Sequence, residues 1–201
     1  MSLVHLLVPG AEGARTLLAL HGRGGTELDL AGLGAALGGG HAVLAPRGPE
    51  REGPGFAWFR HEAIGVPVTE SIDERLAQVA AWLEDVVAEH GIATPMTAVG
   101  FSNGGMMAGS LAAVHPGLVG DVALLSSVYP LPPHILAAGG LAGRRVLAVG
   151  GEDDPFLPPA TVAAGVASYR AAGAEVTAIS RPGGHGVGDE EIAALRRWLG
   201  A

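Results

Sequence analysis

Residues 97–114 read TAVGFSNGGMMAGSLAAV, and this stretch decides the fold of the 201-residue chain. Residues 97–101 form a short apolar run typical of a buried strand, and the residues after Asn103 suit a helix. Between them, Gly100-Phe101-Ser102-Asn103-Gly104 has the GxSxG spacing of a sharp strand-to-helix turn. A Cβ atom at Gly100 or Gly104 would collide with neighbouring backbone there, and Ser102 would be strained with its hydroxyl exposed. The sequence therefore predicts strand, tight turn and helix in direct succession.

Short apolar runs of the same kind recur along the chain. They lie at 3–8, 16–20, 42–45, 97–101, 122–125, 146–149 and 176–179. Most lack polar alternation, which is typical of strands covered on both faces. Alternation of such strands with helices implies parallel pairing and right-handed crossovers. We therefore predict an α/β fold with a mostly parallel, doubly wound sheet of about seven strands and helices on both faces.

Helical periodicity is clearest at 71–90, where apolar residues recur at steps of three and four. Ser71 and Glu74 have the spacing of a capping box at the start of this helix. Further helices are expected after Asn103, near Pro158 or Pro159, and near Asp189. Because the sequence shows no linker or repeat, we expect a single domain that spans residues 1–201.

Composition excludes several classes of protein. Apolar residues make up 48% and charged residues 16%, so the chain should fold rather than remain disordered. Twelve arginines against 20 acidic residues give a charge of −8, which does not favour nucleic-acid binding. The apolar stretch at 129–143 is interrupted by prolines and His134, so no membrane span is expected. The N-terminus lacks the features of a secretory signal, and we expect a cytoplasmic protein.

Ser102 needs a base to become a nucleophile, and His185 is the best candidate among eight histidines. It lies in Pro182-Gly183-Gly184-His185-Gly186, directly after the last expected strand, where glycines let an imidazole project over the sheet. The other histidines have ordinary packed or solvated interpretations. Because ligand sites of such sheets lie beyond the carboxyl ends of the strands, Ser102 and His185 are expected at the same edge.

A carboxylate should fix the tautomer of this histidine. Glu152, Asp153 and Asp154 follow the strand at 146–149. Asp154 is preferred because Pro155 restricts its backbone to an extended region, and Asp153 is the alternative.

An oxyanion formed during acyl transfer needs two preplaced donors. The backbone N–H groups of Asn103 and of Arg23, in the glycine-rich loop His21-Gly22-Arg23-Gly24-Gly25, are the candidates. The Arg23 side chain has two interpretations, a contact to an anionic substrate or a solvated guanidinium. Aromatic and apolar residues near strand ends could line a substrate pocket, with core packing as the alternative for each. These are Trp58, Phe59, Tyr129, Phe156 and Leu157.

Taken together, LHGRGG, APRGPE followed by AWFRH, VGFSNGG, GEDDP with a later Pro158, and GGHGVGDEEIAALRRWL resemble the α/β-hydrolase superfamily. Within it they resemble the phospholipase/carboxylesterase family, which includes acyl-protein thioesterases and hydroquinone-linked bacterial hydrolases. The resemblance implies a triad of Ser102, Asp154 and His185, in that chain order, and hydrolysis of carboxylic or thiol esters without a cofactor. Asn103 stands where the thioesterase branch usually has glutamine, which favours the carboxylesterase branch. The chain has no room for a large lid.

The sequence thus predicts a cofactor-independent serine esterase that cleaves small or medium ester substrates through an acyl-enzyme. A thioesterase and a non-catalytic ligand-binding homologue are the alternatives. No metal is expected, because the sequence lacks HExxH or any close cluster of histidines and carboxylates. The expected partner is a small-molecule ester, with neither nucleic acid nor membrane. The sequence leaves open the physiological substrate, the acyl-chain length and the oligomeric state, including a homodimer.

Overall fold

A seven-stranded sheet forms the centre of the computed structural model, which describes residues 2–38, 40–63, 66–136 and 140–200. The strands are β1 (His5–Val8), β2 (Thr16–Leu20), β3 (Ala42–Pro46), β8 (Met96–Phe101), β9 (Val119–Leu125), β10 (Arg145–Gly151) and β11 (Glu175–Arg181). Their order is β1-β3-β2-β8-β9-β10-β11, and every pairing is parallel except that of β1 with β3. All seven predicted strands are confirmed, as is the mostly parallel doubly wound sheet.

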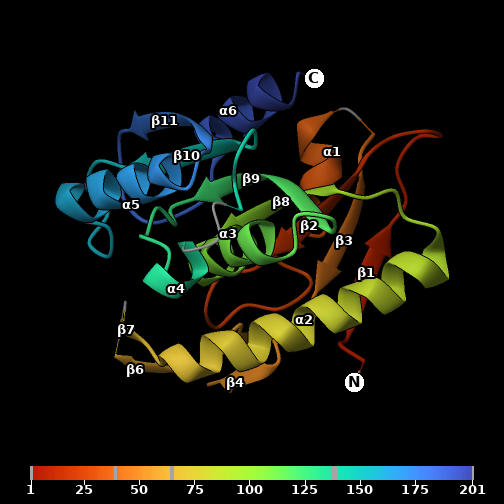
Figure 1. The fold of residues 1–201 in the computed structure, drawn as a ribbon. Helices are drawn as coiled ribbons and strands as arrows, with labels where there is room; N and C mark the ends of the chain where they lie inside the picture. The colour runs from red at the N-terminus through yellow and green to blue at the C-terminus, as the bar shows by residue number, and fades with distance from the viewer. Residues whose placement is uncertain (1, 39, 64–65, 137–139, 201) are drawn as a thin grey trace.

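Helices cover both faces of the sheet, as Figure 1 shows. The helices are α1 (Leu33–Leu37), α2 (Thr69–His90), α3 (Asn103–Val114), α4 (Pro133–Leu136), α5 (Pro159–Ala171) and α6 (Asp189–Leu199). The side chains of α2 and α3 share one apolar core, and those of α1 and α6 meet on the opposite face. Two small antiparallel hairpins lie outside the main sheet, β4 (Glu50–Glu52) with β5 (Gly55–Ala57) and β6 (His61–Ala63) with β7 (Val66–Pro67).

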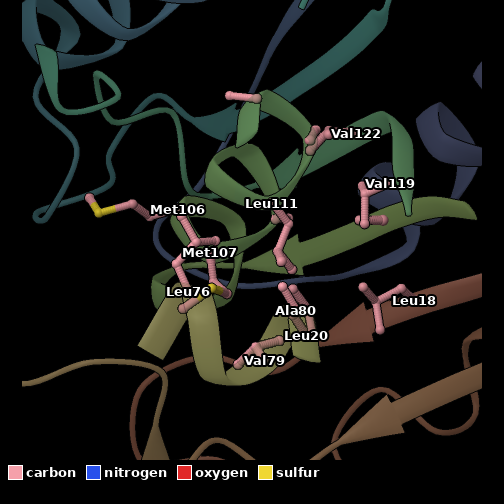
Figure 2. Close-up of a cluster of buried hydrophobic side chains, with 14 of the residues drawn as sticks. Leu18, Leu20, Leu76, Val79, Ala80, Met106, Met107, Leu111, Val119 and Val122 are labelled. Atoms are coloured by element: carbon pink, nitrogen blue, oxygen red, sulfur yellow. The ribbon is translucent and has the colours of Figure 1, made fainter. Parts of the chain in front are cut away.

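The strand residues alternate between the two cores, because successive side chains point to opposite faces of a sheet. In β2, Leu18 and Leu20 join the α2–α3 side, whereas Leu17 and Ala19 join the α1–α6 side. Figure 2 shows the first core, where side chains of α2 and α3 meet those of β2 and β9. Because both faces of the inner strands β2, β3 and β8 are covered, these strands are mostly apolar in the sequence.

The predicted capping box at Ser71 and Glu74 is wrong. Helix α2 begins at Thr69, and its N-cap residue is Val68, with no side-chain cap. The hydroxyl of Ser71 is buried and instead accepts a hydrogen bond from the backbone N–H of Arg60 at 2.9 Å. Ser71 therefore ties the first turn of α2 to the segment before β6.

Candidate active site

Ser102 lies in the turn between β8 and α3 with φ 50° and ψ −119°, a conformation that L-residues rarely adopt. An added Cβ at Gly100 would clash with the backbone of Gly104 and Gly105, and one at Gly104 would clash with the carbonyls of Leu20 and His21. The backbone N–H of Ser102 donates to the carbonyl of Leu125 on β9 at 3.0 Å. The tight turn expected from the GxSxG spacing is therefore present, and the sheet holds it in place.

His185, in the loop after β11, contacts Asp154, in the loop after β10. The Nδ1 atom of His185 lies 2.7 Å from Oδ2 of Asp154, whose carboxylate is fully buried. The other carboxylate oxygen, Oδ1, accepts the backbone N–H of Phe156 at 2.9 Å. Asp153 is exposed, so of the two aspartates considered it is Asp154 that the fold brings to His185. With Nδ1 on the carboxylate, the Nε2 atom of the imidazole is left for another partner.

Ser102 and His185 line the same pocket, which has a volume of about 220 Å³. Its other lining residues are Arg23, Phe59, His61, Pro67, Phe101, Asn103, Met106, Tyr129 and Phe156. The imidazole of His185 lies between two phenyl rings, with centroid distances of 5.0 Å to both Phe101 and Phe156. Ser102 and His185 thus line one pocket, and the buried carboxylate of Asp154 contacts His185 from outside the pocket lining.

Of the five residues expected to line a substrate pocket, Phe59, Tyr129 and Phe156 do so. The indole of Trp58 is instead fully buried, and its Nε1–H donates to the carbonyl of His21 at 2.8 Å. The side chain of Leu157 is buried away from this pocket, beside α5. The structure therefore brings neither of these two residues into the pocket.

The loop after β2 is held rigidly beside the turn at Ser102. Nδ1 of the buried His21 donates to the carbonyl of Gly22 at 2.7 Å, and Nε2 accepts the N–H of Gly48 at 2.9 Å. Burial lowers the pKa of His21, which favours the neutral ring that this pattern requires. On the outer side, the hairpin β4–β5 pairs with the loop through Gly24 N to Phe56 O at 2.8 Å and Phe56 N to Gly25 O at 2.9 Å.

The two candidate oxyanion donors belong to this loop and to the start of α3. No described backbone carbonyl outside the regular elements accepts the N–H of Arg23 or of Asn103. As the first residue of α3, Asn103 has no partner one turn earlier in the helix. Within the described residues, both N–H groups therefore remain candidate donors for an oxyanion.

The side chain of Asn103 connects the helix start to the pocket wall. Its Oδ1 accepts the buried backbone N–H of Trp58 at 2.8 Å, and its Nδ2 lies 3.3 Å from Nε2 of His61. Sequence reasoning did not select His61 for the site, although the residue closes the AWFRH segment. Burial, followed by the charge of Arg23, lowers the pKa of His61, which favours the neutral ring.

Sequence reasoning also missed Ser126 and Ser127, which follow β9. Ser126 has φ 45°, and its hydroxyl donates to the carbonyl of Gly186 at 3.1 Å, one residue after His185. The hydroxyl of Ser127 donates to the carbonyl of Ser102 through a short hydrogen bond. The left-handed backbone of Ser126 carries no sequence signal, because such residues are usually glycine or asparagine. Together the two serines link the Ser102 turn to the His185 loop.

The described part of the chain offers neither a membrane-spanning helix nor a metal-binding cluster. None of its helices has both the length and the apolar character needed to cross a membrane. Within residues 2–38, 40–63, 66–136 and 140–200, no group of three histidine or acidic side chains is placed to hold a metal ion.

Comparisons with known proteins identify related chains and folds. The carboxylesterase of Mesorhizobium loti is 34% identical and has a TM-score of 0.86, covering 93% of this chain and 88% of its own. The Bacillus cereus carboxylesterase is 26% identical with a TM-score of 0.90, covering 98% and 93%. MhqD of Bacillus subtilis is 26% identical over 90% of both chains.

A family model described as the alpha/beta hydrolase fold matches residues 15–139, more than half of the chain. This match and the carboxylesterase structures confirm the resemblance stated from the sequence. The protein belongs to the α/β-hydrolase fold family.

Proposed function

We propose that this protein is a cofactor-independent serine carboxylesterase acting on small or medium esters. The observation that carries the proposal is the contact of 2.7 Å between His185 and the buried Asp154, at the wall of the pocket that Ser102 also lines. The likeness to two bacterial carboxylesterases supports an ester substrate.

In the proposed reaction, His185 takes the proton of the Ser102 hydroxyl as its oxygen attacks the ester carbonyl. Asp154 holds the Nδ1–H tautomer and stabilises the imidazolium. The oxyanion binds the N–H groups of Arg23 and Asn103, and the helix start at Asn103 adds positive potential. His185 returns the proton to the leaving alcohol, and water then hydrolyses the acyl-enzyme through the same groups.

The size of the pocket favours small substrates. Its volume of about 220 Å³ lies below the roughly 300–1,000 Å³ of pockets that hold drug-sized ligands. Phe59, Met106 and Phe156 supply apolar walls for a short acyl or alcohol group.

Turnover of a short-chain p-nitrophenyl ester tests the proposal, with Ser102→Ala as the comparison. We expect the variant to keep its circular dichroism spectrum and to lose about 10⁶ of kcat. A fluorophosphonate probe should label the wild type at Ser102 and leave the variant unlabelled. An unlabelled wild type without ester turnover would support the non-catalytic, ligand-binding alternative. Matched oxygen and thiol esters separate an esterase from a thioesterase.

A further inference from the structure

We propose that the pocket selects esters that carry a carboxylate, which binds the guanidinium of Arg23. This inference rests on the proposed esterase function and names the substrate class of the same site. Arg23 lines the pocket, and its backbone N–H lies in the loop assigned to the oxyanion. An anionic group held by this guanidinium therefore lies within one arginine side chain of the reacting carbonyl.

The charge of Arg23 is incompletely matched within the protein. Its ion pair among the described residues is with Glu52, at 3.6 Å from Nε to Oε1, beyond hydrogen-bonding distance. Both side chains are partly exposed, at 32% for Arg23 and 40% for Glu52. An ion pair of this kind is weak and exchanges readily with water or a ligand.

Two other arginines, unlike Arg23, form close hydrogen bonds with carboxylates. Arg47 makes two hydrogen bonds of 2.6 Å to the carboxylate of Glu27, and Arg75 donates to Glu50 at 2.7 Å. Those guanidinium groups have carboxylate partners that fix their orientation. By contrast, no described residue accepts a hydrogen bond from the guanidinium of Arg23, so its planar donors remain for a ligand.

The rest of the pocket is suited to an anion. In a chain with 20 acidic residues, none of the described residues that line the pocket is acidic. Asp154 lies behind His185, to which it is hydrogen-bonded. Phenyl and thioether groups reduce water in the pocket, which strengthens the attraction between a guanidinium and a carboxylate.

His61 and Asn103 complete a polar wall near Arg23. Nε2 of His61 lies 3.3 Å from the Asn103 amide, which ties the ring to the start of α3. The Arg23 charge contributes to lowering the pKa of His61, which places the guanidinium near this ring. A carboxylate bound here meets one cation and two polar groups, and it competes with the carboxylate of Glu52, which lies 3.6 Å from Nε of Arg23.

The experiment compares two pairs of esters. Within each pair, one ester carries a carboxylate and the other carries a carboxamide at the same position. Monoethyl succinate and ethyl succinamate place the group on the acyl part, and acetoxyacetate and acetoxyacetamide place it on the alcohol part. We expect kcat/KM of the wild type to favour the acid by about tenfold in at least one pair, the energy of a charged hydrogen bond. The favoured pair identifies which part of the ester faces Arg23.

Three variants test the assignment. Arg23→Gln should bring the acid-to-amide ratio close to one, whatever its effect on the rates themselves, because both members of a pair share the oxyanion donors. Glu52→Gln removes the competing carboxylate and should raise the ratio by roughly two- to fivefold. Arg51→Gln is the matched control, because it removes the same charge from the neighbouring hairpin outside the pocket and should leave the ratio unchanged.

A wild-type ratio near one in both pairs, or a ratio that Arg23→Gln does not alter, overturns the inference. If Arg23→Gln fails to fold, the response to Glu52→Gln and a fall of the wild-type ratio with rising salt decide the question. Calorimetric binding of each pair to Ser102→Ala separates this inference from the esterase proposal. Selective binding of the acid without wild-type turnover refutes the esterase function alone, whereas turnover and binding without selectivity refute the anionic substrate alone.

Discussion

The Nδ1 atom of His185 lies 2.7 Å from Oδ2 of Asp154, and the two residues come from the loops that follow neighbouring parallel strands. Thirty-one positions separate them in the chain. Because β10 and β11 pair in register from Arg145 with Glu175 to Gly151 with Arg181, both loops leave the sheet at the same level. The sheet register therefore creates this contact.

Substitution of Asp154 tests the role of the contact. Asp154→Asn should lower kcat by about 10⁴, because an amide does not stabilise the imidazolium or hold the required tautomer. Steady-state kinetics on a p-nitrophenyl ester measures the change. Asp153→Asn is the matched control, since this neighbour is exposed and should retain wild-type activity. A loss of activity in Asp153→Asn, with Asp154→Asn still active, would assign the triad carboxylate to Asp153.

Two substitutions of Ser126 separate the effect of its left-handed backbone from the effect of its hydrogen bond to the His185 loop. Ser126→Ala removes the hydroxyl that donates to Gly186 and should cost about 1 kcal/mol of unfolding free energy. Ser126→Gly removes the same hydroxyl but relieves the left-handed backbone, and should regain about 1 kcal/mol. Both variants should show a lower kcat with little change in KM, because the His185 loop is less well held. If Ser126→Gly regained both stability and wild-type kcat although its hydroxyl is missing, the positioning role would be contradicted.

The side chain of Asn103 should matter for stability. Asn103→Ala leaves the buried N–H of Trp58 without its acceptor, at a cost of about 1–3 kcal/mol. Urea denaturation followed by tryptophan fluorescence measures the change. Asn103→Asp keeps an acceptor oxygen for Trp58 and should be less destabilised. A stable alanine variant would mean that water replaces the amide oxygen.

The neutral state of His21 predicts how stability depends on pH. Burial lowers the pKa of His21 below its ordinary value of 6.5, so the folded state binds a proton less readily than the unfolded state. The stabilisation is present above pH 6.5 and is lost as pH falls from there through the lowered pKa. His21→Gln should reduce the slope of unfolding free energy against pH in that window. An unchanged slope would show that other groups control the acid sensitivity.

The central sheet could be predicted because both its faces are covered. Runs such as those at 16–20 and 146–149 are apolar throughout, which distinguishes buried parallel strands from amphipathic helices. The start of α2 could not be placed as well. Ser71 has the right spacing for a cap, but it bonds to Arg60, a partner that only the folded chain brings near.

The candidate active site likewise has residues that could be predicted from the sequence and residues that could not. The turn at Ser102 could be predicted from Gly100 and Gly104, where an added Cβ would clash with neighbouring backbone. The place of His185 could be predicted because the residue follows a strand.

Trp58 and Phe59 are adjacent in sequence, yet one is buried behind the site and the other lines it. Trp58 is held behind the site by hydrogen bonds with Asn103 and His21, partners that only the folded chain brings near. His61 was missed for a similar reason, because its contact with the Asn103 amide exists only in the folded chain.

The pairing of β5 with the loop after β2 has a consequence for engineering this protein. A Cβ at Gly55 would overlap the carbonyl of Gly24, next to Arg23. In a saturation library over the β4–β5 segment, exposed positions such as Arg51 should accept most replacements. Alteration of Gly55 should instead shift the loop that carries the proposed oxyanion donor Arg23, and should lower the proposed esterase activity from outside the pocket. Attempts to reshape the hairpin for new substrates should therefore retain this glycine.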